Sequence, residues 1–222
     1  DTLGGYWEVV GDDGTDRVYS GESLIFDDFV EPICFVTGTG ILTPDGEVAV
    51  ESLKPGDLVV TAEGETLPVR WIGHQTVATR FADPFTGLPV LIREGALGEN
   101  LPNRDLLVSP AHALLLQGVL VQAGALVNGS SIVRVKPVEE TFRYWHIELD
   151  GHRLVLAQGV PAESFLDTVE RVRFDNWDEY LAIHGEAERG WIEEMDLPRA
   201  KSARQLPRAL REQLEARAAA LA

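Results

Sequence analysis

Cysteine and histidine side chains are the groups in this chain best suited to covalent chemistry. The chain contains one cysteine, Cys34, and five histidines. A thiol nucleophile needs a base or a hydrogen-bond partner, and histidine is the usual one. We expect His74, near a turn, and His184, in a charged segment, to be structural. A single cysteine excludes an intramolecular disulfide and every metal site that requires several cysteines.

The other three histidines lie where strands and turns could bring them to a thiol. Ser109 and His112 are three residues apart across a proline-containing turn between two apolar runs, so their side chains can converge. His146 and His152 flank a second, glycine-containing turn. A metal site built from His146, His152 and a carboxylate is a weak alternative, because two histidines six residues apart are poor evidence for one. We therefore predict no metal and no cofactor.

The residues around Cys34 favour a chemical role for the thiol over a purely structural one. Free cysteine is among the most buried residue types, so a structural thiol is the alternative. However, Gly38 and Gly40 follow it closely and permit a tight backbone turn. Phe35 and Ile41 are expected to anchor the segment in the core.

The elements that must position these groups are mainly short strands. Residues 34–166 contain apolar runs separated by turn-forming Pro, Gly, Asn and Asp, without the alternating long helices of a βαβ sheet. Residues 1–33 carry nine acidic residues and one basic residue, and include another β-like run. Examples of the predicted strands are Tyr6–Val10, Asp57–Thr61, Pro68–Ile72, Asp105–Val108, His112–Leu116 and Tyr144–Leu149.

Residues 167–222 have a helical character. Aromatic and charged residues alternate at helix-like spacing over 178–182 and 186–195, and Leu206, Leu210 and Leu214 repeat every four residues. Residues 199–217 contain six basic and two acidic residues, which we expect to form the polar face of a packed or protruding helix. Docking to a membrane or a partner is the alternative for this basic face.

Composition limits the possible partners. The chain is 45% hydrophobic, is 25% charged and has a net charge of −17. Phosphate binding requires clustered Lys and Arg, so nucleic acid is not an expected partner. No apolar run approaches the ~18 residues needed to span a membrane.

Four ordered segments resemble the conserved blocks of Hint domains, the module shared by Hedgehog autoprocessing domains and inteins. The first opens with Cys34, and the second resembles the family pattern V-x-x-L-x-x-G-D-x-V. The third ends in His112, with Ser109 at the family's threonine position, and the fourth resembles the closing strands. The match is closest to stand-alone bacterial Hint domains. The four segments are Cys34–Ile41, Val50–Val59, Leu106–His112 and Asp150–Val160.

This resemblance implies a mostly β, horseshoe-like fold of short strands with a helical C-terminal segment. It implies that Cys34, His112 and His152 meet in a central cleft. Cys34 would attack the carbonyl carbon of Ile33, converting the Ile33–Cys34 peptide into a thioester by an N-to-S acyl shift. His112 would protonate the leaving nitrogen, and Ser109 would orient the imidazole or hydrogen-bond the scissile amide.

The sequence also departs from the intein pattern. Inteins end in His-Asn, and cyclisation of that asparagine cuts the second junction, whereas Glu163 and Ser164 occupy the matching places here. Complete splicing is therefore not expected. His146 stands where inteins carry an aspartate, and a helper role follows only from that position. The C-terminal segment is not conspicuously apolar, so a sterol acceptor is not supported.

We accordingly predict an autoprocessing domain at 34–166, preceded by an upstream segment at 1–33 and followed by a helical extension at 167–222. Its substrate would be its own upstream polypeptide, and water or a small nucleophile such as an amine would resolve the thioester. The alternatives are an inactive Hint-fold scaffold or docking module, and a Cys/His hydrolase acting on other molecules. Attachment of bacterial relatives to exported proteins favours secretion or a cell-surface location.

Overall fold

The structure is a computed structural model of the 222-residue chain, and it describes residues 6–10, 16–20, 33–166, 171–185 and 192–221. The chain forms two compact units, Asp1–Val30 and Glu31–Ala222. In the first unit, β1 (Tyr6–Val10) pairs with β2 (Asp16–Ser20) in an antiparallel hairpin. This confirms the strand predicted at Tyr6–Val10.

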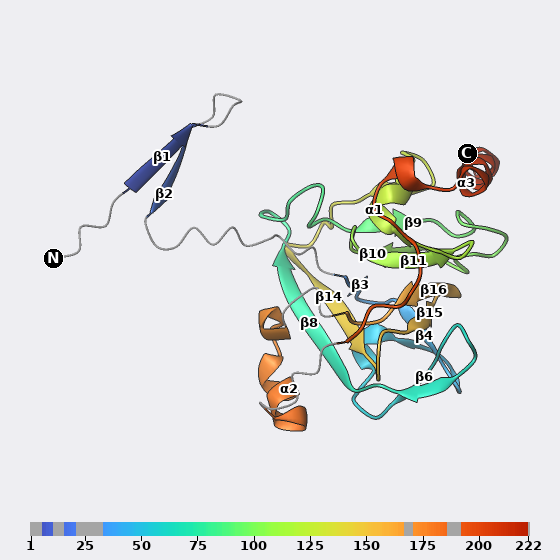
Figure 1. Cartoon of the computed structure of the whole chain (residues 1–222), viewed down its shortest axis with the longest axis horizontal. Helices are drawn as coiled ribbons and strands as arrows, with labels where there is room; N and C mark the ends of the chain where they lie inside the picture. The colour runs from blue at the N-terminus through green and yellow to red at the C-terminus, as the bar shows by residue number, and fades with distance from the viewer. Residues whose placement is uncertain (1–5, 11–15, 21–32, 167–170, 186–191, 222) are drawn as a thin grey trace. The chain divides into compact units, whose positions relative to one another are not determined.

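A six-stranded sheet in the second unit carries Cys34 next to its short central strand. β8 (Trp71–Ala78) and β14 (Thr141–Glu148) pair antiparallel along their full eight-residue lengths. β3 (Phe35–Val36) lies between β14 and β10 (Leu106–Val108) (Figure 1). Side chains on β14 alternate between exposed and buried at its start, which is the pattern of a strand with one solvated face. The strands, in sheet order, are β13 (Ile132–Arg134), β9 (Val90–Ile92), β10 (Leu106–Val108), β3 (Phe35–Val36), β14 (Thr141–Glu148) and β8 (Trp71–Ala78).

A seven-stranded sheet forms the second layer of this unit. It includes the strand after His112, the hairpin that contains Glu163 and, at one edge, a strand from the C-terminal segment. The strands, in sheet order, are β17 (Arg199–Ala200), β12 (Val119–Gln122), β11 (Ala113–Leu116), β16 (Val160–Glu163), β15 (Leu154–Ala157), β4 (Gly40–Thr43) and β5 (Gly46–Ala49). A separate pair joins β6 (Leu58–Val60) to β7 (Thr66–Pro68).

Apolar side chains from both sheets share one large core, and a smaller cluster lies around Ala113, Leu120 and Leu154. Phe35 and Ile41 are 1% and 0% exposed, so the residues that follow Cys34 anchor the segment as expected. Between them, Gly38 has φ of +88°, a conformation that favours glycine. At Gly40 a Cβ atom would meet the Arg104 guanidinium, so a larger residue there would force that side chain to move.

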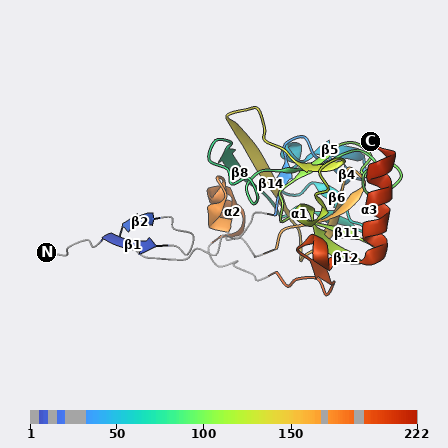
Figure 2. The ribbon, with the colours of Figure 1, turned by 90° about the horizontal axis from the view of Figure 1, so that it is seen from above.

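Two helices of the C-terminal segment pack against the rest of the second unit. α2 (Trp177–His184) lies beside β8 in Figure 1, where Asn176 accepts a hydrogen bond from His74 N–H and donates one to the Ile72 carbonyl. α3 (Arg208–Ala220) runs along the edge of the unit beside β11 (Figure 2). Leu210 and Leu214 bury this helix in the common core.

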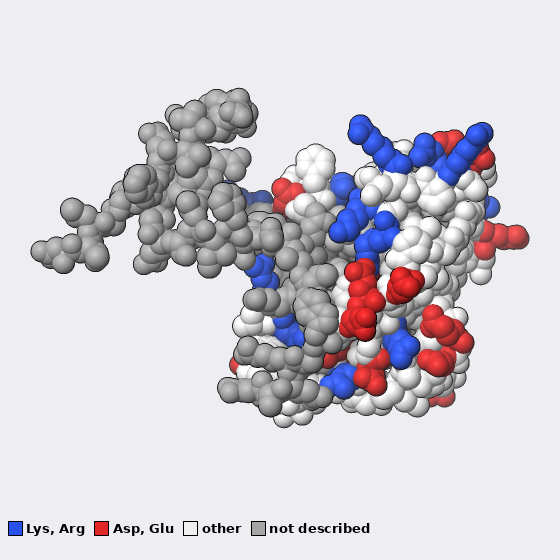
Figure 3. Space-filling model, in the orientation of Figure 1, with Lys and Arg blue, Asp and Glu red and all other residues white. Residues whose placement is uncertain are grey.

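Four of the six basic residues of 199–217 are exposed, whereas Arg199 is largely buried beside Glu163. Figure 3 shows Lys and Arg side chains gathered around α3, while acidic side chains are interspersed with basic ones over the lower part of the same face. Because α3 is anchored through its leucines, its exposed Arg208 and Arg211 form part of the polar face of a packed helix. Lys201 and Arg204 are also exposed, but they precede α3, so the predicted helix face holds only part of the basic set.

The predominantly β fold with helices in the C-terminal segment confirms the predicted fold class. The remaining predicted strands correspond to β6, β10, β11 and β14 within a few residues, and α2 covers the helix predicted at 178–182. Two predictions were wrong in detail. The strand predicted at Pro68–Ile72 is divided between β7 and β8, because Arg70 N–H turns to the Glu148 carbonyl at the start of the β8–β14 pairing.

The second correction concerns the helix predicted at 186–195. Residues 186–191 lie outside the described residues, and residues 192–195 are not helical. Tertiary hydrogen bonds tie the end of this stretch and the residues after it to the rest of the unit: Met195 N–H donates to His152 Nδ1, and Leu120 N–H donates to the Pro198 carbonyl. The segment then enters the seven-stranded sheet as β17.

Candidate active site

The backbone of Cys34 is held on both sides by Ser109. Cys34 immediately precedes β3, and its side chain is completely buried. Cys34 N–H donates to Ser109 Oγ at 2.8 Å, and Ser109 N–H donates to the Cys34 carbonyl at 2.9 Å. The Ile33–Cys34 peptide nitrogen is therefore fixed by a hydroxyl group, and Ile33 itself is 5% exposed.

His112 is positioned by the turn that begins at Ser109. Its N–H donates to the Ser109 carbonyl, and its ring packs 4.3 Å from the Phe35 ring. Nε2 lies 3.1 Å from the Glu163 carbonyl oxygen. A carbonyl can only accept, so Nε2 carries the proton and Nδ1 of the neutral ring carries the lone pair. Nδ1 is buried without a hydrogen-bond partner among the described residues.

Burial keeps the His112 ring neutral near pH 7. Desolvation lowers the pKa of His112, while the Glu163 carboxylate and the main chains of Cys34 and Glu163 act in the opposite direction. Protonation of this ring therefore costs free energy, but the nearby carboxylate partly offsets that cost.

His146 brings a second neutral imidazole to the thiol. It projects from β14, and its Nδ1 lies 3.6 Å from Cys34 Sγ. Its ring packs edge-on against Phe165 at 4.7 Å and also contacts Phe174. Burial is the main cause that lowers the pKa of His146 to about 3, and the nearby His112 ring adds to it because two protonated rings would repel each other. Burial likewise raises the pKa of the Cys34 thiol, so a neutral thiol faces a neutral imidazole nitrogen.

A buried carboxylate that we did not predict to be functional lies behind His112. Glu163 is 1% exposed, and Arg199 contacts both of its oxygens, with Nη2 2.7 Å from Oε2. Burial alone would raise the pKa of Glu163, but hydrogen bonds from His152 and Arg199 and the charge of Arg199 lower it to about 2. The carboxylate is therefore ionised at neutral pH.

The predicted site residues thus fall into two layers. Cys34, Ser109, His112 and His146 gather around the Ile33–Cys34 peptide. His152 lies in the second layer: its Nδ1 accepts from Met195 N–H, and its Nε2 is 3.3 Å from Glu163 Oε2. Its described contacts are with these groups and do not include Cys34.

Glu163 could have been noticed in the sequence as a charged residue in an otherwise apolar run. Arg199 offered no such signal, because its partner is 36 residues away. The two histidines expected to be structural lie on the β8–α2 side: His74 is 3.6 Å from Asp175, and His184 Nε2 is 3.2 Å from the Arg70 carbonyl.

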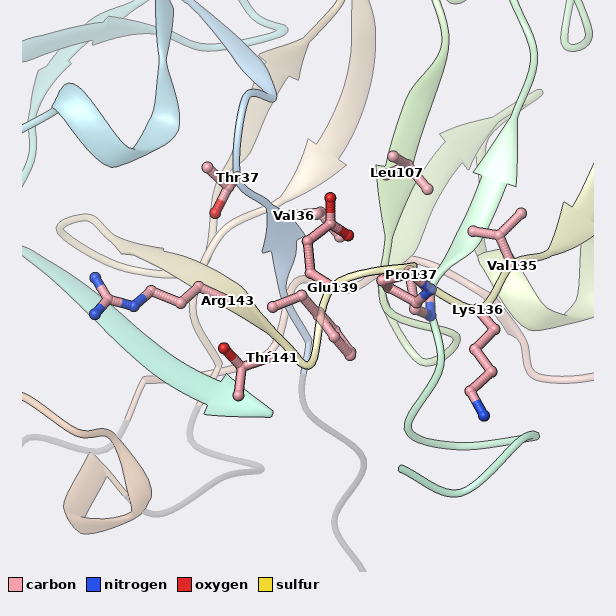
Figure 4. A pocket seen from close by; sticks show the side chains of 11 residues that line it. Val36, Thr37, Leu107, Val135, Lys136, Pro137, Glu139, Thr141 and Arg143 are labelled. Atoms are coloured by element: carbon pink, nitrogen blue, oxygen red, sulfur yellow. The ribbon is translucent and has the colours of Figure 1, made fainter. Parts of the chain in front are cut away.

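A surface pocket of about 590 Å³ opens beside β3 but is not lined by the reacting groups. Figure 4 shows Val36, Thr37 and Leu107 on one side of it and the segment from Val135 to Arg143 around the rest. Lys136, Glu139 and Arg143 place charged groups at its margin. The cluster of thiol and imidazoles is therefore separate from the pocket lining.

Within the described ranges, no group of three or more His, Cys, Asp and Glu side chains is arranged to hold a metal ion. His146 and His152, the pair considered for a metal, contact different partners. The same part of the chain contains no helix with the length and apolar composition required to cross a bilayer.

Comparison with known proteins identifies the class. A family model described as a Hint domain matches residues 33–169, so the chain belongs to the Hint domain family, a fold associated with autoprocessing. Similar solved structures include a bacterial intein-like domain from Clostridium thermocellum, with 18% identity over 60% of this chain and 98% of that one and a TM-score of 0.44. Another is the MchDnaB-1 intein, with 14% identity over 59% and 99% of the two chains and a TM-score of 0.42. No curated protein gives a match.

Proposed function

We propose that this protein cleaves its own chain at Ile33–Cys34 through a thioester. The observation that carries the proposal is the pair of contacts at Cys34: the amide nitrogen is bound to Ser109 Oγ at 2.8 Å, and Sγ lies 3.6 Å from His146 Nδ1. The nucleophile and the peptide bond that it attacks belong to neighbouring residues, so the reaction is intramolecular and positioning supplies much of its acceleration.

The two histidines provide a route for the proton that must move. Cys34 Sγ attacks the Ile33 carbonyl carbon as its proton passes to His146 Nδ1. In the tetrahedral intermediate this proton passes from His146 to Nδ1 of the neutral His112 ring. The carbon–nitrogen bond then breaks as the transiently protonated His112 donates the same proton to the leaving nitrogen. Both imidazoles end neutral, so one proton has moved from sulfur to nitrogen and no other reactant is consumed. A general acid of this kind typically contributes about 10²–10⁴ in rate.

Ser109 and His152 have supporting roles in this proposal. Ser109 holds the scissile nitrogen and, through its carbonyl, the backbone of His112. His152 contributes through Glu163. Water or a small amine then attacks the thioester carbonyl, the carbon–sulfur bond breaks, and Cys34 recovers its proton. The products are the upstream polypeptide, ending at Ile33, and a chain that begins at Cys34.

The second junction of an intein has no counterpart in this chemistry. Glu163 and Ser164 stand at the places of the intein His-Asn pair, and both are engaged elsewhere: Glu163 with Arg199, and Ser164 Oγ with Arg153 N–H at 2.9 Å. Without a terminal asparagine, cyclisation is impossible. The proposed reaction is therefore cleavage without splicing.

An inactive scaffold is the second candidate, and one observation favours it. Cys34 is completely buried and burial raises the pKa of its thiol, so the reactive thiolate is scarce. In this alternative the same contacts only stabilise the fold.

Thiol-induced release separates the two candidates. The full chain would carry a folded protein fused before Asp1, and intact mass would be followed with and without dithiothreitol. Autoprocessing predicts a fragment beginning at Cys34 that forms faster with the thiol and is absent in Cys34→Ala. A single uncut mass under all conditions supports the scaffold. Cleavage that persists in Cys34→Ala refutes the mechanism.

A further inference from the structure

Glu163 holds His112 from two sides. Its carbonyl oxygen accepts from His112 Nε2–H at 3.1 Å, while its carboxylate Oε1 accepts from the N–H of Ala113 at 2.7 Å. The ring and the peptide that follows it are therefore both fixed by one residue. This arrangement keeps the His112 proton on Nε2 and leaves Nδ1 as the free basic atom.

The contacts of Glu163 with His112 and Ala113 require a positive charge beside its carboxylate. All of its hydrogen-bonding partners are buried or nearly so, and Arg199 is the guanidinium group that contacts both oxygens, at 3.2 and 2.7 Å. A bidentate pair of this kind fixes direction as well as charge. Without the guanidinium, a buried carboxylate would take up a proton or move, because an uncompensated charge is costly in the interior.

Arg199 comes from outside the residues matched by the family model, which end at 169. β17 adds to the seven-stranded sheet in parallel with β12, pairing Arg199 with Leu120. Glu194 also contacts the guanidinium, 2.7 Å from Nη2, and Met195 N–H fixes His152 against Glu163. The 192–200 stretch thus converges on the carboxylate behind His112.

We propose that Arg199 and Glu163 are positioning residues of the autoprocessing reaction, which makes the C-terminal segment a required part of the site. The inference rests on the proposed function and assigns that segment a role in it. Arg199 holds the carboxylate, the carboxylate and its carbonyl hold His112, and His112 presents Nδ1 to the scissile nitrogen. Neither Glu163 nor Arg199 touches the reacting atoms in this scheme.

The test compares release from the N-terminal fusion in the wild type and in Arg199→Gln between pH 5 and 9. We expect the variant to be roughly 10- to 100-fold slower, as misplacement of a reacting group would predict. We also expect a new inflection in its pH–rate profile, with the rate falling as pH drops, because Glu163 now titrates in this range. A purely structural role would lower the folded fraction without adding an inflection.

Two variants complete the design. Arg208→Gln removes an exposed guanidinium that pairs with Glu212 on the same helix, and it should cleave like the wild type. Arg199→Lys keeps the charge without the bidentate contact, so it should recover part of the rate and lose the new inflection. If Arg199→Gln does not fold, Arg199→Lys decides: a wild-type rate in that variant overturns the proposal. A folded Arg199→Gln with the wild-type rate and profile also overturns it.

The ring state of His112 gives a readout that does not require cleavage. Nitrogen NMR of the full chain should show the Nε2–H form in the wild type and a changed His112 signal in Arg199→Gln, with Arg208→Gln unchanged. Identical His112 signals in Arg199→Gln and the wild type overturn the positioning role. If the wild-type chain shows the expected His112 signals but never cleaves, the proposed function is refuted, while the contact between Glu163 and His112 is confirmed.

Discussion

Glu163 should make an acid-sensitive contribution to folding stability that can be isolated by one substitution. Its pKa falls from an ordinary value of 4.5 to about 2 in the folded chain. At about 1.36 kcal/mol for each pKa unit, this difference corresponds to about 3 kcal/mol of stabilisation at neutral pH. Because the folded pKa is the lower one, the contribution is complete above the unfolded pKa and is lost as the pH falls toward 2.

Urea unfolding of the wild type and Glu163→Gln measures this contribution, with the fluorescence of buried Trp71 as a reporter. The difference in unfolding free energy between the two chains should narrow by about 2 kcal/mol between pH 7 and about pH 3. Over this interval the folded chain loses about that much of the stabilisation that the lowered pKa of Glu163 provides. The other carboxylates titrate in both chains, so their effect cancels when the two unfolding free energies are subtracted. Glu212→Gln, which lies on the surface of α3, should show no such narrowing. If the difference in unfolding free energy between the wild type and Glu163→Gln stays constant with pH, the reasoning is refuted.

Three further substitutions test other parts of the account. His112→Gln should slow release of the upstream fragment by about 10²–10⁴, the usual contribution of a general acid; a rate within twofold would contradict its assignment. Ser109→Ala leaves the buried Cys34 N–H without its 2.8 Å acceptor and should lower the unfolding free energy by about 1–3 kcal/mol in urea titrations. Leu210→Ala, in the buried face of α3, should cost about 2–5 kcal/mol in the same assay, and an unchanged midpoint would show that α3 is not part of the cooperative core.

Short motifs and the resemblance to Hint domains were enough to predict which side chains lie near Cys34. The proposed chemistry of Cys34 depends on neighbours that are marked in these motifs: Gly38 and Gly40 shortly after it, and Ser109 and His112 three residues apart. Turn formers between apolar runs also predicted the six strands named from the sequence, five of which are confirmed, because burial on one face of a sheet leaves a periodic signal.

The second layer was not predictable in the same way. Glu163 and Arg199 meet because β17 joins β12 in parallel, and parallel pairing between distant segments has no local signature. The incorrect helix at 192–195 has a related cause. The N–H of Met195 donates to His152, far away in sequence, instead of to a carbonyl within a helix, so a tertiary contact overrides the helical spacing.

The central claim is that the Ile33 carbonyl becomes a thioester on Cys34. Hydroxylamine tests it most directly, because this amine attacks thioesters readily and would leave a hydroxamate on the released fragment. Mass spectrometry of that fragment from the N-terminal fusion should find the hydroxamate at Ile33, and since Cys34 is the chain's single cysteine the thioester can have only one location. Release of a fragment ending in a plain carboxylic acid at another residue, or a hydroxamate that also forms in Cys34→Ala, would contradict the account.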